Sequence, residues 1–299
     1  MNRREFLATT SLGLAASSQA ADAEPIALGF SLYGMKTLSL ADGVKACSQI
    51  GYDSVELAVM PGWPGEPKLL SADDRKDLRT RLKDARLSLP AIMENCPLDG
   101  KDEYLDRLKA AAELGHALSP KEPPVIETIL GGKPDQWEVV RNAFADRLGK
   151  WAKLAEREKI TIGLKAHRFG TTNRPEHVRW LLDQVKSDRL QAVYDWSHFE
   201  QRDMKLADTL KELLPVTRFV HVKDTVMEKG QAKFVLPGEG STDYIALLKG
   251  LKDAGYSGSV CVEVSGMVFG KKDYDPVAAA KKCYAALAPA FEKAGVRRG

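Results

Sequence analysis

The chain has no CxxC pair among its four cysteines, which excludes zinc ribbons and dithiol redox motifs. It also has no basic tract with interleaved aromatic residues, and its 44 Lys and Arg stand against 41 Asp and Glu, for a formal net charge of +3. We therefore expect no nucleic acid as a partner. The apolar runs are too short for a membrane-spanning helix. No glycine-rich phosphate-binding sequence follows any expected strand, which argues against a doubly wound dinucleotide-binding sheet.

The first 23 residues are expected to be a signal peptide that is not part of the fold. Arg3 and Arg4 precede a short apolar stretch and a small-residue cleavage site, as in twin-arginine export signals. We expect the mature domain to span residues 24–299 and to be periplasmic, or otherwise exported through the twin-arginine pathway. The alternative is the N-terminal helix of a cytoplasmic protein. Export permits disulfides, but the cysteine spacing favours buried free thiols.

Apolar runs that end in polar side chains recur along the rest of the chain, and each gap between them can hold a helix. The expected strands are 26–33, 54–59, 87–93, 124–130, 160–167, 190–196, 218–223 and 259–265. Eight strand–helix units predict an α/β protein, a single (β/α)8 TIM barrel whose site lies at the C-terminal ends of the strands. The long segment 225–240 is expected to be a loop with a functional role.

The strand alternation predicts which side chains face the barrel interior, because successive side chains point to opposite faces. The inward polar positions are Glu56, Glu127, Lys165, His167, Asp195, His221, Lys223 and Glu263. Buried charges are costly unless they are paired or bound to metal, and four acids against two lysines leave negative charge in excess. Asp195, His221 and Glu263 form a mixed oxygen and nitrogen set suited to Mn²⁺, Mg²⁺, Co²⁺ or Zn²⁺. A metal-free network of buried ion pairs is the alternative.

Several short motifs occur in an order and spacing that resemble the xylose isomerase-like barrel superfamily, specifically its sugar phosphate isomerase/epimerase group. The motifs are 51–57, 194–198, 220–224, 237–240 and 262–263. The resemblance covers nearly all of the mature chain. It implies one divalent metal bound by an acid on strand 5, an aspartate on strand 6, a histidine on strand 7 and a glutamate on strand 8.

Three of the ligands implied by the resemblance are present, as Asp195, His221 and Glu263, and His198 matches a family histidine that contacts a substrate oxygen. Lys165 stands where the first acid is usually found. The resemblance implies a sugar or polyol substrate and an isomerase or epimerase, with lyase chemistry related to both. The metal would polarise a carbonyl while a base removes the adjacent proton.

The expected roles follow from these matches and from the inward positions. Lys165, His167, His198 and Glu263 are the expected catalytic residues, and Glu56, Glu127, Trp63, Trp196 and Lys223 are expected to contact substrate. Lys165 can be a structural cation, a Schiff-base nucleophile or a general base or acid. We favour proton transfer, which needs desolvation to lower the pKa of Lys165.

Two other classes of protein compete with the enzyme. One is a non-catalytic sugar-binding barrel that has lost the strand-5 acid. The other, a DNA-repair endonuclease of the same superfamily, is disfavoured because its three-metal site needs more histidines than the five present. His116 and His177 are expected on the surface or at the rim. The sequence leaves a homo-oligomer open.

Overall fold

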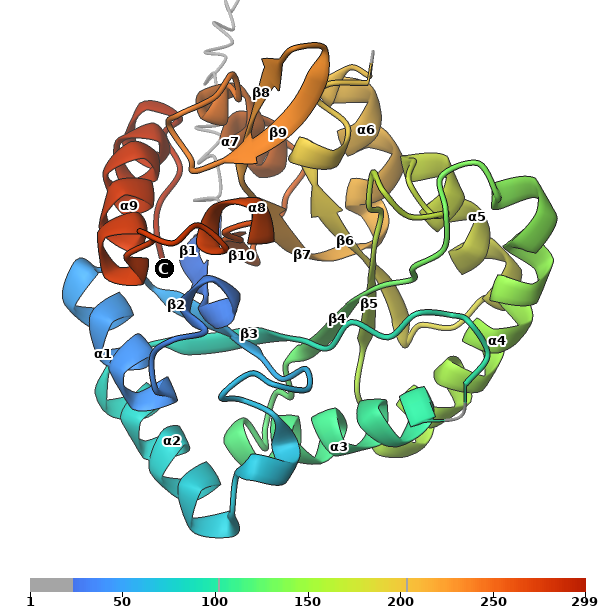
Figure 1. Cartoon of the computed structure of the whole chain (residues 1–299), viewed down its shortest axis with the longest axis horizontal. Helices are drawn as coiled ribbons and strands as arrows, with labels where there is room; N and C mark the ends of the chain where they lie inside the picture. The colour runs from blue at the N-terminus through green and yellow to red at the C-terminus, as the bar shows by residue number, and fades with distance from the viewer. Residues whose placement is uncertain (1–23, 102, 203) are drawn as a thin grey trace, which may run out of the picture.

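The protein is described from a computed structural model that covers residues 24–101, 103–202 and 204–299. Eight parallel strands close into a barrel in the order β1-β10-β7-β6-β5-β4-β3-β2, and helices surround it (Figure 1). The barrel strands are β1 (Ala27–Ser31), β2 (Ser54–Ala58), β3 (Ser88–Met93), β4 (Val125–Ile129), β5 (Ile162–Lys165), β6 (Leu190–Asp195), β7 (Thr217–Val222) and β10 (Ser259–Val262). This confirms the predicted (β/α)8 architecture. The expected signal peptide lies outside the described residues.

The helices alternate with the strands as the sequence predicts. They are α1 (Leu40–Ile50), α2 (Ala72–Asp84), α3 (Glu103–Leu118), α4 (Trp137–Glu158), α5 (Pro175–Val185), α6 (Leu206–Leu213), α7 (Tyr244–Asp253), α8 (Gly266–Phe269) and α9 (Pro276–Lys293). Local chemistry sets their ends. Ser71 and Asp74 form a capping box at the start of α2, and Gly51, with a φ of 104°, ends α1 in the left-handed conformation.

Several strands end earlier at the mouth of the barrel than the sequence predicted. The strand predicted at 160–167 stops at Lys165, and the one predicted at 259–265 stops at Val262. At the end of β6, the side chain of Asp195 accepts a hydrogen bond from the backbone N–H of Ser197 and starts a 3-10 turn. Such local bonds offer the backbone an alternative to the sheet ladder. The polar tips of the strands therefore lie in the first turn of the loops.

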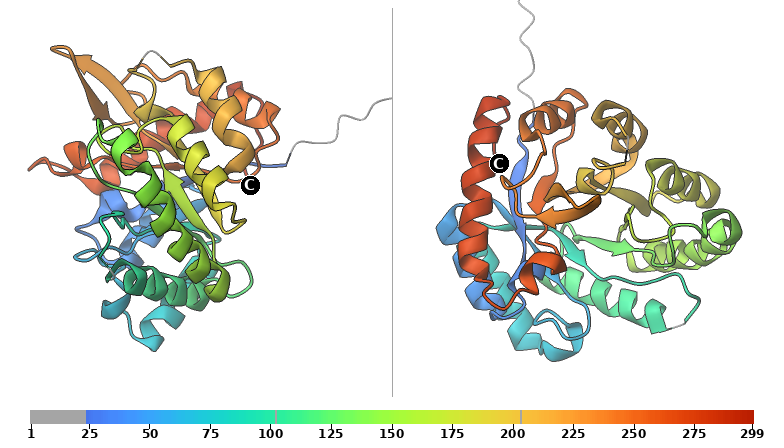
Figure 2. Two further views of the ribbon diagram at one scale, coloured as in Figure 1. Left: turned by 90° about the vertical axis from the view of Figure 1, so that its right-hand side faces the viewer. Right: turned by 45° about the horizontal axis from the view of Figure 1, so that its top comes forward.

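The segment 225–240 is not an irregular loop, so that prediction was wrong. It contains most of a two-stranded antiparallel hairpin, β8 (Asp224–Glu228) and β9 (Gln231–Val235), which projects from the barrel end (Figure 2). The turn at Lys229 and Gly230 has positive φ at both residues, 51° and 78°, as two-residue hairpin turns require. The carboxylate of Asp224 anchors the base of the hairpin by accepting backbone hydrogen bonds from Gly238, Gly240 and Thr242.

The apolar core has two main layers, and a small third cluster of Ala58, Met60 and Met93 lies beside Tyr33 and Trp63. The larger layer fills the space between the barrel and the helices, and the smaller one fills the lumen with Ala91, Val125, Val193, Phe219 and Cys261. In this inner layer Gly163 lets its neighbours approach closely, because a Cβ there would lie 2.6 Å from Val193 Cγ2. The lumen is therefore plugged below the polar residues, and these residues can be reached only from the C-terminal ends of the strands.

Both ends of the described chain lie together at the opposite end of the barrel. The N–H of Ile26 donates to the carbonyl of Arg297 at 2.9 Å, and Arg298 pairs with Asp53. Figure 2 (left) draws the C-terminus on one side of the molecule and the β8–β9 hairpin on the other.

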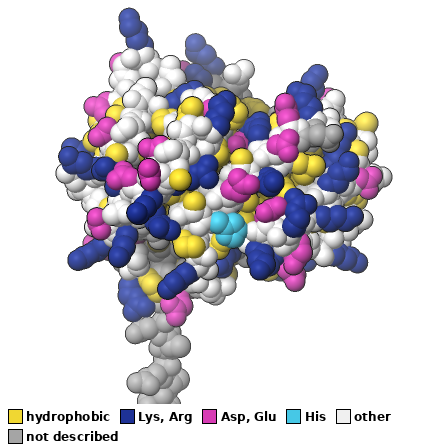
Figure 3. Space-filling view, turned by 90° about the horizontal axis from the view of Figure 1, so that it is seen from below, with side chains coloured by type: hydrophobic (Ala, Val, Ile, Leu, Met, Phe, Trp, Pro, Cys, Tyr) yellow, Lys and Arg dark blue, Asp and Glu magenta, His cyan; other side chains and the backbone are white. Residues whose placement is uncertain are grey.

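All four cysteines are buried free thiols, as expected. On the face drawn in Figure 3, Lys and Arg are interspersed with Asp and Glu rather than gathered in one stripe. Within the described part of the chain, none of the helices has the length and apolar character needed to cross a bilayer.

Candidate active site

A layer of charged side chains lies on the apolar plug, at the C-terminal ends of five neighbouring strands and at β2. Four acids, two lysines and a histidine meet there: Glu56, Glu127, Asp195, Glu263, Lys165, Lys223 and His221. Burial of so many charges is tolerated because they pair with one another. The strand alternation correctly placed all seven in the lumen.

Lys165, at the end of β5, has the most contacts in this layer. Its Nζ lies 2.8 Å from Glu127 Oε1, 3.0 Å from His221 Nδ1 and 3.2 Å from Glu263 Oε2. Burial alone would lower its pKa, but the charges of Glu127, Glu263 and Asp195 outweigh burial and raise the pKa. The expected lowering of the Lys165 pKa toward neutrality is therefore wrong, and the side chain stays protonated in this layer.

Lys223, just after β7, supplies the second cation. Its ammonium bonds to Asp195 Oδ2 and lies 2.5 Å from Glu263 Oε2. The two lysines thus share one oxygen of Glu263. Burial favours the neutral acid, but Lys165, Lys223 and His221 hold the pKa of Glu263 well below its usual range. Among the described residues, every side-chain contact of Glu263 uses Oε2, which leaves Oε1 for a ligand.

His221, on β7, lies between Glu56 and Lys165. Its Nε2 lies 3.0 Å from Glu56 Oε2, and its Nδ1 faces Lys165. Burial disfavours the imidazolium, Glu56 favours it, and the pKa of His221 is raised. The ammonium of Lys165 beside Nδ1 nevertheless leaves no room for a second ring proton. We therefore assign the neutral tautomer, in which Nε2–H donates to Glu56.

Glu127, on β4, differs from the other acids. Its Oε1 lies 2.8 Å from Lys165 Nζ, and among the described residues its side chain has no other hydrogen-bond partner. Burial raises its pKa against the opposing effect of Lys165. Environment therefore pushes the pKa values of Glu127 and Glu263 in opposite directions, an arrangement typical of sites that transfer protons.

His198 and His167 lie beside Lys223 as neutral imidazoles. His198 Nδ1 accepts the N–H of Arg168, and its Nε2 lies 3.3 Å from Asp195 Oδ2. Burial and the charge of Lys223 lower the pKa of His198 to about 4. Burial and His198 lower the pKa of His167 to about 2. The two rings are 4.4 Å apart, but His198 is wholly enclosed while His167 is half-buried at the rim.

Aromatic side chains line the mouth. Tyr33 stacks on Trp63, with ring centres 5.3 Å apart, and meets Phe269 edge-on. Burial, followed by the charge of Glu263, raises the pKa of the Tyr33 phenol to about 12. Trp63 is thus positioned at the rim as expected. Trp196 packs in the main core instead, and this geometry favours packing over substrate contact.

Three residues at the mouth were missed by the sequence reasoning. Tyr33 had the inward position on its strand, so a signal was available. Phe234 lies on β9, which was expected to be loop, and its ring centre is 5.0 Å from Lys223 Nζ and 5.2 Å from the ring of His198. The guanidinium carbon of Arg168 lies 5.9 Å from the centre of the same ring. The hairpin therefore covers the side of the site where Lys223 and His198 lie.

His177 and His116 lie away from this layer. His177 is buried and stacks on Trp137 at 4.0 Å, which contradicts the expected surface position and reflects packing of α5 on α4. His116 Nε2 contacts the carbonyl of Glu158 at 2.7 Å.

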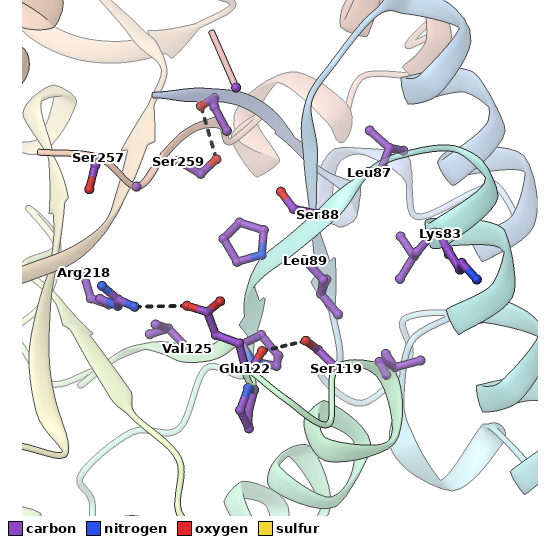
Figure 4. A pocket seen from close by; sticks show the side chains of 18 of the residues that line it. Lys83, Leu87, Ser88, Leu89, Ser119, Glu122, Val125, Arg218, Ser257 and Ser259 are labelled. Atoms are coloured by element: carbon purple, nitrogen blue, oxygen red, sulfur yellow. Dashed lines mark hydrogen bonds and ion pairs between the residues drawn. The ribbon is translucent and has the colours of Figure 1, made fainter. Parts of the chain in front are cut away.

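A hollow of about 550 Å³ opens at the other end of the barrel, at the N-terminal ends of the strands (Figure 4). In this view Arg218 pairs with Glu122, at 3.3 Å, and Ser119 Oγ donates to the carbonyl of Glu122. Barrel enzymes have their sites at the other end. The apolar plug separates this hollow from the charged layer, so we assign it no part in the chemistry.

Asp195, His221 and Glu263 can hold a metal ion by residue type and by spacing. One ligand atom from each lies within 4.8 Å of the others, and all three residues are buried. Two carboxylates and an imidazole suit a divalent ion of the first transition row or Mg²⁺. The donor set therefore fits, although both lysines also contact it.

A closed (β/α)8 barrel with buried acids, lysines and histidines at the C-terminal strand ends defines an enzyme-type site. The chain belongs to the xylose isomerase-like TIM barrel family, whose family model matches residues 44–296. This confirms the resemblance seen in the sequence.

Comparisons with single proteins agree with the family. An inosose isomerase of Halalkalibacterium halodurans is 23% identical over 240 residues, covering 77% of this chain and 84% of the relative. An inosose dehydratase of Clostridium perfringens is 22% identical over 168 residues, covering 51% of this chain and 55% of the relative. The crystal structure of the IOLI protein with a bound zinc atom superposes with a TM-score of 0.72 at 22% identity, covering 89% of this chain and 99% of that one. The kinship supports an enzyme of the isomerase or epimerase class, with lyase chemistry also represented.

Proposed function

We propose that the protein is an isomerase, an epimerase or a related lyase that transfers a proton next to the carbonyl of a sugar or polyol. The observation that supports this most is the geometry of Glu263: Lys165 and Lys223 lie 3.2 and 2.5 Å from its Oε2, and its Oε1 is left for a ligand. Isomerisation, epimerisation and dehydration share the removal of such a proton as their first step.

Glu263 is the base in this proposal. It is 9% exposed, whereas the other three acids of the layer are at most 1% exposed, so it is the acid that a substrate at the mouth can reach. Lys165 and Lys223 keep Oε2 occupied and keep the carboxylate ionised. The substrate proton would pass to Oε1. Lys223 and Lys165 stabilise the negative charge that then develops on the substrate oxygen.

The aromatic rim orients the substrate. Trp63 and Tyr33 offer ring faces for the apolar face of a sugar, and Phe234 excludes water from the lysine side. Asp195 holds Lys223 in position by accepting a hydrogen bond from its ammonium, and His198 Nε2 faces the same carboxylate. We assign His167, half-buried at the rim, a substrate contact.

We also propose that Asp195, His221 and Glu263 bind one divalent ion, Mn²⁺, Mg²⁺, Co²⁺ or Zn²⁺. When bound, such an ion polarises a carbonyl and replaces charge that the lysines otherwise provide. The donor set and its burial support this site.

Export through the twin-arginine pathway is part of the proposal. It is supported by Arg3 and Arg4 of the first 23 residues, ahead of the apolar stretch.

Turnover on a panel of inososes, keto-sugars and aldo-sugars tests the reaction, with and without added Mn²⁺. Solvent deuterium should appear at the carbon next to the carbonyl, and Glu263→Gln should abolish this exchange. The second candidate, a sugar-binding barrel without activity, is favoured by the lysine at position 165. Binding of a panel sugar with neither turnover nor deuterium exchange would establish it.

A further inference from the structure

We infer that Lys165 and a divalent ion are alternative occupants of one place in the barrel. Lys165 thereby stabilises the metal-free site and sets how weakly the metal is held. This inference rests on the proposed metal site of Asp195, His221 and Glu263.

The first step is geometric. Nζ of Lys165 lies 3.0 Å from His221 Nδ1 and 3.2 Å from Glu263 Oε2, and these two ligand atoms are 3.6 Å apart. An ion bonded to both at roughly 2.1 Å would lie no farther than about 3.6 Å from that ammonium nitrogen, whichever side it entered. No water fits between two cations at that separation, and the one carboxylate oxygen that they share offsets only part of their repulsion.

The second step concerns the lone pair of the imidazole. A neutral imidazole has one lone pair, and in His221 it lies on Nδ1 because Nε2–H donates to Glu56. The ammonium of Lys165 donates to this lone pair, which is the one a metal would use. Of the three metal ligands, Lys223 contacts only the two carboxylates, whose oxygens have further lone pairs. Lys165 is therefore the stricter competitor of the two lysines.

The third step is that Lys165 can withdraw without losing every partner. Glu127 is not among the three ligands. Its Oε1 lies 2.8 Å from Nζ, and among the described residues its side chain has no partner other than Lys165. An entering ion would displace the ammonium from His221 and Glu263 toward Glu127. The site then has two states, one closed by the lysine and one closed by the metal. The second state has two more positive charges, because the displaced ammonium stays beside Glu127.

The test is Mn²⁺ binding by calorimetry to protein stripped with chelator and then dialysed. Wild type should bind one Mn²⁺ weakly, and Lys165→Met should bind it about tenfold or more tightly, because the competing cation is gone. Lys165→Gln, which is polar and close in length, should also tighten binding and covers the case in which the methionine variant does not fold. Lys165→Arg keeps the charge and should stay weak.

Controls assign the effect to this site. Lys282→Met removes an exposed lysine that pairs with Glu239, and it should leave Mn²⁺ affinity unchanged. Adding His221→Ala to Lys165→Met should abolish the tight binding. Folded Lys165 variants that bind Mn²⁺ no more tightly than wild type would overturn the inference. The absence of Mn²⁺ binding in both wild type and the Lys165 variants would also overturn it. Turnover and deuterium exchange, measured separately, test the proposed reaction, and their failure alone would leave the competition intact.

Discussion

Removing Lys165 from the metal-free protein should lower its stability sharply. In Lys165→Met the carboxylates of Glu127 and Glu263 lose a buried cation at 2.8 and 3.2 Å. Breaking a buried ion pair from one side costs about 3–5 kcal/mol, because the remaining charge stays desolvated. For a domain of this size each kcal/mol lowers Tm by about 2–4 °C, so a decrease of roughly 10 °C is expected.

The pH dependence of this loss has a definite sign. The pKa of Glu127 is already raised by burial, and loss of Lys165 raises it further. A carboxyl whose pKa is higher in the folded than in the unfolded state binds more protons when folded, so acidification favours folding. The difference in unfolding free energy between wild type and Lys165→Met should therefore shrink as the pH falls from 8 to 5.

Urea unfolding in EDTA, followed by circular dichroism, measures both effects. The double variant Lys165→Met, Glu127→Gln should recover much of the loss, because it leaves fewer unpaired charges. Lys282→Met should change the free energy of unfolding by less than about 0.5 kcal/mol, as expected for an exposed pair. A Lys165→Met loss no larger than that of Lys282→Met, or one that grows on acidification, would refute the reasoning.

Three further predictions concern other parts of the chain. Burial, against the effect of Arg107, raises the pKa of Glu94 to about 7, so wild type should gain about 2.5 kcal/mol of unfolding free energy between pH 8 and pH 5 from this group. Glu94→Gln should lose that gain in urea titrations at the two pH values. In calorimetry with Mn²⁺, His221→Ala should abolish the weak one-to-one binding expected of wild type, and unchanged binding would remove His221 from the ligand set. Lysine in place of both Arg3 and Arg4 should leave the protein in the cytoplasm on cell fractionation, and unchanged periplasmic protein would contradict the export signal.

The sequence predicted the positions in the barrel interior because they depend only on the twofold alternation of a strand. Glu56, Glu127, Asp195, His221 and Glu263 were assigned this way. How far a lysine reaches from its strand is not encoded in that alternation. The contact of Lys165 with His221, across 56 residues of chain, depends on the barrel closing around both. The role favoured for Lys165 required burial to lower its pKa, whereas Glu127, Glu263 and Asp195 raise it, as in the alternative of a structural cation.

The β8–β9 hairpin was missed for a local reason. Its strands are short and polar, and the turn at Lys229 and Gly230 lacks the Asn-Gly or Asp-Gly signal that marks hairpins most strongly. Because the hairpin was not predicted, Phe234, which covers Lys223 and His198, was not predicted either. The seven residues of the layer were therefore predictable, whereas the hairpin that covers Lys223 was not.

The meeting of the two chain ends below the barrel has a practical consequence. Pro25 and Gly299 lie side by side, at the end of the molecule farthest from the hairpin. A resin or a carrier protein attached through the C-terminus would hold the molecule with its mouth facing the solution, and substrate access would be unaffected. A short flexible linker between residues 24 and 299 would also allow circular permutation, with new ends in the exposed turn of the hairpin. In such a permutant β8 and β9 would no longer be joined by their turn, and every strand of the barrel would stay intact.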